Sequence, residues 1–228
     1  MSVVADILQV RPDTVDQALD VAIEALRAGE LIIIPTDTVY GLAGELSAHV
    51  ARRIYAAKNR RYDLPLPVLI ADLGQLAQVA RSIPSAAELL GRRYWPGPLT
   101  LVLQRAESVP SEVTSGGETV GVRVPDHELM LAMLEHYGSP IVATSANPSG
   151  CPSATQVSEL SDSLLDAVAV VLDAGPCTLR QASTVLDLTT RPPHVLRPGP
   201  ISAEELSAAV DMEVVLAGNC DGDRTCGR

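Results

Sequence analysis

The chain alternates short apolar runs with longer segments whose apolar residues recur at helical spacing, and this alternation constrains its fold more than any other feature. In the segment 14–29, Leu19, Ile23 and Leu26 fall on one face of a helix, and the apolar run 31–34 follows directly. Connections of hairpin length and of helix length both occur. The pattern therefore predicts an α/β fold with a mixed sheet rather than a purely parallel one.

The individual elements follow from this pattern together with capping and turn residues. Strands are predicted at 31–34, 68–70, 99–103, 120–124, 141–143, 168–172, 183–188 and 195–197. Helices are predicted after a Thr14/Gln17 capping box, over Ala48–Ala57, from Ser85 (with Glu88) to about Arg93, after Asp126, within 157–165, and after Ser202 with Glu205. No repeat or linker divides the chain, so one catalytic domain is expected over 1–217 and a disordered tail over 218–228.

Composition limits the classes of function. The net charge of −11 argues against sequence-independent nucleic-acid binding, because such binding needs a basic face. No apolar run approaches the roughly 20 residues that span a bilayer, and the N-terminus shows no secretory signal. A cytoplasmic protein without membrane association is expected. Its four scattered cysteines show no metal-ligand spacing, and although Cys220 and Cys226 could pair in an oxidising compartment, free thiols are expected in the cytosol.

Residues 35–42 (PTDTVYGL) place Thr36, Asp37 and Thr38 directly after a buried strand. Two hydroxyls beside a carboxylate can hydrogen-bond a small polar substrate or help to hold hydrated magnesium. The same residue types also suit a turn that is capped by its own side chains. Taken alone, the segment leaves both interpretations open.

Lys58 is the only lysine in the chain, and it begins the run KNRR (58–61) at the end of the helix expected over Ala48–Ala57. One interpretation is that these cations stabilise the helix C-terminus. The other is a phosphate clamp, in which Lys58 supplies a point charge and Arg60 a bidentate fork. The buried run that follows (PLPVLI) would give such a clamp a firm base, which favours the second interpretation.

Four later segments also carry polar residues on predicted strands or directly beside them. Arg123 lies mid-strand and points opposite to its two valine neighbours, so it needs an anionic partner. Taken alone, this segment favours an ion pair within the protein over a carboxylate or phosphate of a ligand. The loop 144–153 (TSANPSGCPS) is rich in N–H and O–H donors that suit an anion or a nucleotide, although no GxxxxGK[ST] or GxGxxG motif occurs. The pair 183–184 and the segment 196–199 (LRPG) complete the set.

Taken together and in this order, these segments resemble the YrdC family of L-threonylcarbamoyl-adenylate synthases. The matching motifs, spread over about 29–201, are PTDTVYGL, KNR ahead of LPLPVLI, RVPDH, SANPSG, STVLDLT and LRPGP. Each motif alone is weak, whereas six in one order are specific. The resemblance is to the short, single-domain form, and it implies a YrdC-like twisted open mixed sheet with flanking helices and a large concave cavity.

The resemblance implies an enzyme that condenses L-threonine, bicarbonate or carbon dioxide, and ATP into threonylcarbamoyl-AMP with release of pyrophosphate. A partner transferase would then pass the threonylcarbamoyl group to the adenosine next to the anticodon of certain tRNAs. Magnesium (Mg²⁺) is expected to arrive with ATP rather than at a metal site of the protein. No stable nucleic-acid binding is expected.

The resemblance also implies roles for individual residues. Contacts to threonine are expected from Thr36, Arg123, Ala143 and Ser183. Contacts to ATP are expected from Lys58, Arg60, Thr119, Ser145, Ser153 and Arg197. Within this set Lys58 and Arg60 would contact the phosphates and form the catalytic pair.

Two positions depart from the family pattern. Leu64 stands where many members carry a polar or basic residue, and Leu69 stands where some carry a histidine. Arg61 could supply a contact that these changes remove, and His127 is interpreted as structural because it follows a Pro-Asp pair. The alternatives to the synthase are a nucleic-acid-binding module and a carbamoyl-transfer enzyme like the YrdC-like domains of larger hydrogenase-maturation proteins.

Overall fold

The computed structural model describes residues 5–217. Its strands are β1 Asp6–Gln9, β2 Ile32–Ile34, β3 Gly41–Glu45, β4 Val68–Leu69, β5 Leu99–Gln104, β6 Thr119–Arg123, β7 Ile141–Ser145, β8 Val170–Asp173, β9 Thr184–Asp187, β10 His194–Arg197 and β11 Val215–Leu216. Its helices are α1 Val15–Arg27, α2 Ala48–Ala57, α3 Leu76–Val79, α4 Ser85–Tyr94, α5 Glu128–Tyr137, α6 Asp162–Leu165 and α7 Ala203–Val210, with short 3₁₀ turns η1 Leu73–Gln75 and η2 Val157–Glu159.

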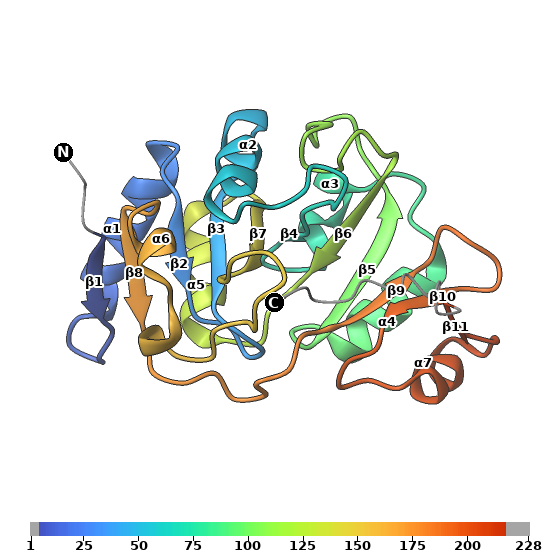
Figure 1. The fold of residues 1–228 in the computed structure, drawn as a ribbon. Helices are drawn as coiled ribbons and strands as arrows, with labels where there is room; N and C mark the ends of the chain where they lie inside the picture. The colour runs from blue at the N-terminus through green and yellow to red at the C-terminus, as the bar shows by residue number, and fades with distance from the viewer. Residues whose placement is uncertain (1–4, 218–228) are drawn as a thin grey trace, which may run out of the picture.

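All of these strands belong to one mixed sheet, in the order β1-β8-β2-β3-β7-β4-β6-β5-β9-β10-β11 (Figure 1). Both parallel and antiparallel pairs occur along it: β4 pairs with β6 in parallel and with β7 in antiparallel fashion. The prediction of a mixed α/β sheet is confirmed. The sheet brings together segments far apart in sequence, as where β1 lies beside β8 (Figure 1).

The alternation of side chains along the strands produces a core on each face of the sheet. Leu31 and Ile33 belong to one cluster of buried residues, whereas Ile32 and Ile34 belong to the other. Because successive strand residues point to opposite faces, one apolar run serves both cores. The second cluster includes α1 and α5, and the first includes α2, α3, α4 and α7.

Strand β5 shows the same alternation with a different outcome. Leu99, Leu101 and Leu103 are buried in the first core, on the face that α4 covers. The residues between them, Thr100 and Val102, point to the opposite face, and there they line a pocket. The sheet thus keeps one face of this region closed by apolar packing and leaves the other available for ligand binding.

Most predicted elements are confirmed, and α2 has the predicted bounds. The capping box of α7 is also confirmed, since Ser202 accepts from the Glu205 backbone and the Glu205 carboxylate accepts from the backbone N–H of Ser202. The helix expected within 157–165 is instead two short pieces, η2 and α6, because Leu160 and Ser161 between them are extended. Strands β1, β3 and β11 were not predicted.

Three other helix caps were predicted wrongly. The Thr14 hydroxyl makes no capping bond in α1; it donates to the carbonyl of Gln9 instead. Pro84 precedes α4, so Ser85 is already helical and the Ser85/Glu88 capping box does not form. Similarly, α5 begins one residue later than expected, with His127 as its N-cap residue, and the N–H of Asp126 is bonded to Asp37.

Two predictions concern the ends of the chain. The tail over 218–228, with Cys220 and Cys226, lies outside the described residues, and a single catalytic domain over 1–217 stays a prediction. The two cysteines that the structure describes, Cys151 and Cys177, are both free thiols. Within residues 5–217 no helix combines the length and the apolar character needed to cross a bilayer.

Gly199 is the position where added volume should disturb the fold most directly at the pocket. A Cβ atom there would lie 2.3 Å from the backbone nitrogen of Thr184 and 2.6 Å from the carbonyl carbon of Ser183. We expect Gly199→Ala to lower the free energy of unfolding by about 1–3 kcal/mol, the usual cost of overpacking. Urea denaturation would measure this loss, and Glu107→Ala at an exposed turn should stay within about 0.5 kcal/mol of the parent. Equal stability of Gly199→Ala and the parent would contradict this packing.

Candidate active site

A pocket with a volume of about 370 Å³ opens on the uncovered face of the sheet. Residues from every motif identified in the sequence line it, and none of the lining residues belongs to a helix. Of the ten residues expected to contact substrates, the pocket gathers nine: Thr36, Arg60, Thr119, Arg123, Ala143, Ser145, Ser153, Ser183 and Arg197. The tenth, Lys58, is not among the lining residues. That the pocket forms the large concave cavity implied by the resemblance stays a prediction.

Strand register explains the floor of the pocket. Thr100 of β5 lies beside Val185 of β9, and Val102 lies beside both Asp187 and Gly121. These residues point to the same face because they are two apart along their strands. The floor is therefore mainly small or apolar, with a single carboxylate, Asp187, at one edge.

Arg123 is the most buried charge in the pocket, with 8% of its side chain exposed. Its Nε donates to the carbonyl of Gly97 at 2.9 Å, and Nη1 donates to the Thr38 hydroxyl at 2.8 Å. Its Nη2 forms an ion pair with Asp37 Oδ1 at 2.5 Å. Taken alone, the sequence around Arg123 favoured an ion pair within the protein over one with a ligand. The structure shows the internal pair, in a side chain that also lines the pocket.

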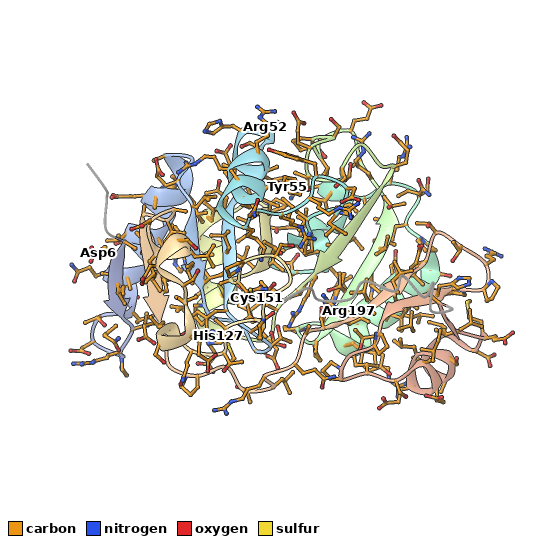
Figure 2. The ribbon with its side chains drawn as sticks, viewed as in Figure 1. Asp6, Arg52, Tyr55, His127, Cys151 and Arg197 are labelled. Atoms are coloured by element: carbon orange, nitrogen blue, oxygen red, sulfur yellow. The ribbon has the colours of Figure 1, made fainter. Side chains whose placement is uncertain are left out.

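Arg197 is the last residue of β10 (Figure 2) and lines the pocket. Its Nε donates to the carbonyl of Ser183 and its Nη2 donates to the Ser183 hydroxyl, both at 3.0 Å. That hydroxyl also lies 2.8 Å from the Thr100 hydroxyl. The late Ser-Thr pair and the LRPG segment therefore form one unit, in which Ser183 holds the guanidinium against the pocket floor.

Arg60 is the third guanidinium of the pocket and is held by its own loop. Its Nε donates to the carbonyl of Leu64 and its Nη2 to that of Pro65. Desolvation lowers the pKa of Arg197 from its ordinary value, and the charges of Arg123 and Arg60 lower it further. Each guanidinium is thus fixed by a backbone carbonyl, and the positive charges repel one another across the pocket. Such a site is prepared for an anion.

Thr36 is used mainly to hold the turn after β2. Its hydroxyl donates to the carbonyl of Val39 at 2.6 Å and accepts from the N–H groups of Thr38 and Val39. The Thr38 hydroxyl lies 3.0 Å from it and receives the bond from Arg123. The capped-turn interpretation of PTDTVYGL is therefore confirmed. The same turn lines the pocket, and its contact with a substrate stays a prediction.

Lys58 is buried beside the pocket, with 1% of the residue exposed. Its ammonium group donates to the carbonyl of Ser145 and, at 3.3 Å, to Asn147 Oδ1. The Lys58 carbonyl accepts from the N–H of Ser149. Lys58 therefore connects the end of α2 to the loop after β7. Its ammonium group bonds this loop rather than the last carbonyls of α2, which the helix-capping interpretation required.

Comparison with known proteins identifies this arrangement. A family model described as Sua5_yciO_yrdC: Telomere recombination matches residues 24–199. The chain belongs to the Sua5/YciO/YrdC family.

Several members of the Sua5/YciO/YrdC family are similar over most of this chain. Threonylcarbamoyl-AMP synthase of Pyrococcus abyssi is 42% identical and the enzyme of that name from Bacillus subtilis is 41% identical. The matches cover 90% and 86% of this chain but only 60% and 58% of those relatives. A Mycobacterium tuberculosis relative, provisionally named as the same enzyme, is 35% identical, and the match covers 89% of this chain and 93% of that protein.

Solved structures of the family agree with the fold. P. abyssi Sua5 complexed with L-threonine superposes with a TM-score of 0.89 at 37% identity, over 98% of this chain and 65% of the other. Escherichia coli YciO superposes with a TM-score of 0.79 over 89% of this chain and 99% of the other, but at 24% identity it supports the fold alone. The open mixed sheet expected from the motifs is therefore the Sua5/YciO fold.

Sequence reasoning missed several residues of this family site. Thr100 and Val102 form the floor, and the signal that could have found them is the alternation of β5, where the leucines take one face and Thr100 and Val102 the other. Asp187 also lines the pocket, and its Oδ1 accepts from the N–H and hydroxyl of Thr189. No group of three or more metal-ligating side chains occurs in the part of the chain that the structure describes.

The departures from the family pattern have unequal consequences. Leu69 lines the pocket next to Arg123 of β6 and makes that part apolar, whereas Leu64 is 42% exposed and is not a lining residue. Arg61 pairs with Asp63 at the surface and does not line the pocket. The structure therefore gives no support to the idea that Arg61 replaces a lost contact. His127 is part-buried, and burial lowers its pKa.

Lys58 gives a test by pH. Burial, followed by the charge of Arg60, lowers its pKa to about 7. Because the unfolded chain keeps a lysine pKa near 10.4, it binds a proton above about pH 7 that the folded protein lacks, so stability rises with pH by up to about 1.4 kcal/mol per unit. Relative to Lys58→Met, the parent should gain free energy of unfolding between pH 7 and 9, as measured by urea denaturation. Parallel pH profiles of the two proteins would contradict the lowered pKa.

Proposed function

We propose that this protein synthesises threonylcarbamoyl-AMP from L-threonine, bicarbonate or carbon dioxide, and ATP, with release of pyrophosphate. The observation that carries the proposal is the pocket with three fixed guanidinium groups, Arg60, Arg123 and Arg197, beside hydroxyl-rich loops. Family membership supports it, as do the names of relatives at 35–42% identity.

The proposed chemistry needs no nucleophile from the protein. The amine of threonine combines with bicarbonate to give a carbamate and water. A carbamate oxygen then attacks the α-phosphorus of ATP, the bond from that phosphorus to the bridging oxygen breaks, and pyrophosphate leaves. The protein must align two anions and neutralise developing charge, which fixed N–H donors do without reorganisation. The pocket lining contains no cysteine or histidine, and this agrees with such a mechanism.

Within this mechanism, Arg123 is proposed to bind the threonine carboxylate, near Thr36, Ala143 and Ser183. Proposed ATP contacts come from Arg60, Thr119, Ser145, Ser153 and Arg197. Mg²⁺ would enter as part of the ATP substrate, since Mg²⁺ is commonly held by one or two carboxylates, substrate phosphates and water. Lys58 donates to the carbonyl of Ser145. It would therefore influence the phosphates by holding the Ser145 loop in place, and it would contact them directly only if its ammonium group left that carbonyl.

The product would be used by a transferase that modifies the adenosine next to the anticodon of tRNA, and the protein is proposed to work in the cytoplasm. A nucleic-acid-binding module remains the alternative of a different class, and a net charge of −11 disfavours it. Tight, salt-sensitive binding of tRNA without ATP in a mobility-shift assay would favour that alternative. Structural similarity to HypF, at 21% identity, concerns the fold alone.

Omitting substrates one at a time tests the proposed reaction. Pyrophosphate release from ATP should require both L-threonine and bicarbonate, because the attacking oxygen belongs to a carbamate formed from the two. A coupled pyrophosphate assay measures this, with L-valine in place of L-threonine as the matched control. Release that continues at the same rate without L-threonine would refute the synthase.

The arginines of the pocket give a second test. Arg60→Ala and Arg197→Ala should each reduce kcat by about 10²-fold or more, the cost of losing one preorganised charge contact. Arg52→Ala is the matched control, because Arg52 lies on α2 away from Arg197 and pairs with Glu112 at the surface (Figure 2). It should keep the rate of the parent. If both pocket variants keep a rate near that of the parent, Arg60 and Arg197 do not stabilise the phosphates in the transition state.

A further inference from the structure

Asp37 lies directly behind the pocket and has no role in the proposed reaction so far. It is 5% exposed and is not a lining residue, whereas its partner Arg123 is. The ion pair joins the turn after β2 to the end of β6, over 86 positions in sequence. Asp37 Oδ1 also accepts from the N–H of Asp126 at 3.2 Å, so two segments hold this carboxylate in place.

The ion pair with Asp37 leaves some N–H donors of the Arg123 guanidinium available for a ligand. A guanidinium carries five N–H groups and cannot act as an acceptor. Gly97, Thr38 and Asp37 each take one of them. One N–H therefore remains on each of Nη1 and Nη2, in a side chain that lines the pocket. Two such donors in a fixed plane are suited to both oxygens of a carboxylate.

The pair is poorly explained as a device for stability alone. Replacing a buried ion pair by apolar groups is often neutral or stabilising, because desolvation costs offset the attraction. Here Asp37 Oδ2 is buried and has no hydrogen-bond partner among the described residues, and the same holds for His127 Nδ1. An unsatisfied buried carboxylate oxygen costs free energy of folding. Because Asp37 pairs with an arginine that lines the pocket, this cost suggests that Asp37 has a function in the site.

We infer that Asp37 is a positioning residue that fixes the plane of the Arg123 guanidinium for the carboxylate of the amino-acid substrate. The inference rests on the proposed function and adds to it the group that makes Arg123 selective for a carboxylate. Thr38 assists, since its hydroxyl accepts from Nη1 and lies against Thr36. Without Asp37, the guanidinium keeps its charge but loses the contact that orients Nη2.

A ligand without a carboxylate separates this role from a merely structural one. L-Threonine and L-threonine amide share an amine, a hydroxyl and a methyl group, and they differ in the carboxylate that Arg123 would bind. If Asp37 acts through Arg123, its loss should weaken L-threonine and leave L-threonine amide unaffected. If Asp37 only stabilises the fold, its loss should weaken both ligands equally.

Isothermal titration calorimetry of both ligands with the full chain tests the inference. The parent should prefer L-threonine to its amide, and Asp37→Ala should reduce that preference by about tenfold or more, since small misplacements of binding groups can cost about 10²-fold. Asp37→Asn should lose less, because its amide oxygen can still accept from Nη2. The control Glu112→Ala, which removes the surface pair with Arg52, should keep the preference of the parent.

Two outcomes would overturn the inference. One is an equal loss of affinity for both ligands in Asp37→Asn and Asp37→Ala, and the other is a parent that does not distinguish them. Asp37→Asn preserves the shape of the side chain, so it carries the test if Asp37→Ala does not fold. Failure of the proposed function is seen separately, as pyrophosphate release by the parent that does not depend on L-threonine.

Discussion

The buried guanidinium of Arg123 is the contact on which the rest of the site depends. It joins the turn after β2, the segment before β5 and the end of β6, through Asp37, Thr38 and Gly97. None of these segments could present a fixed donor by itself, because a turn of hydroxyl residues and a lone strand arginine both have other conformations. Strand β6 is four positions from β2 in the sheet order, so the turn reaches across the sheet edge and the ion pair fixes its placement there. The cost of desolvating a charge is accepted where the charge has to face a ligand.

The second requirement is an uncovered area of sheet. Helices α1 and α5 cover one face of β2, β3, β7 and β8 with apolar side chains. This apolar cluster ends at Leu69 of β4 and Ala143 of β7, and both of these residues also line the pocket. Beyond this point the same face carries Thr100, Val102, Thr119 and Arg123. The opposite face stays apolar throughout, so β5 and β6 are anchored from behind by the first core. A rigid floor with one open side results, and binding residues on strands are held more firmly than binding residues on loops.

Much of this could be predicted from the sequence, and the failures have physical causes. Periodicity identified the strands at 31–34 and 99–103 and the helix Ala48–Ala57, because burial on one or both faces leaves a clear pattern. Strand β3 (GLAGE) was missed because it has two glycines and no β-branched residue; it is a strand because it pairs with β2 on one side and β7 on the other. Six motifs in order predicted nine residues of the pocket. Lys58 was the exception, since charge alone cannot tell whether an ammonium group faces a ligand or a buried carbonyl.

The division between arginine and lysine in this site follows from how each tolerates burial. Arginine stays charged when it is desolvated, so Arg60, Arg123 and Arg197 can face a ligand as permanent cations. Lysine loses its proton more readily, and the pKa of Lys58 is lowered to about 7 by burial and then by the charge of Arg60. An anion bound at Arg60 would cancel part of that repulsion and raise the pKa of Lys58. Binding of phosphate at Arg60 would thereby favour protonation of the amine that contacts Ser145 and Asn147, and would strengthen the tie between α2 and the loop after β7.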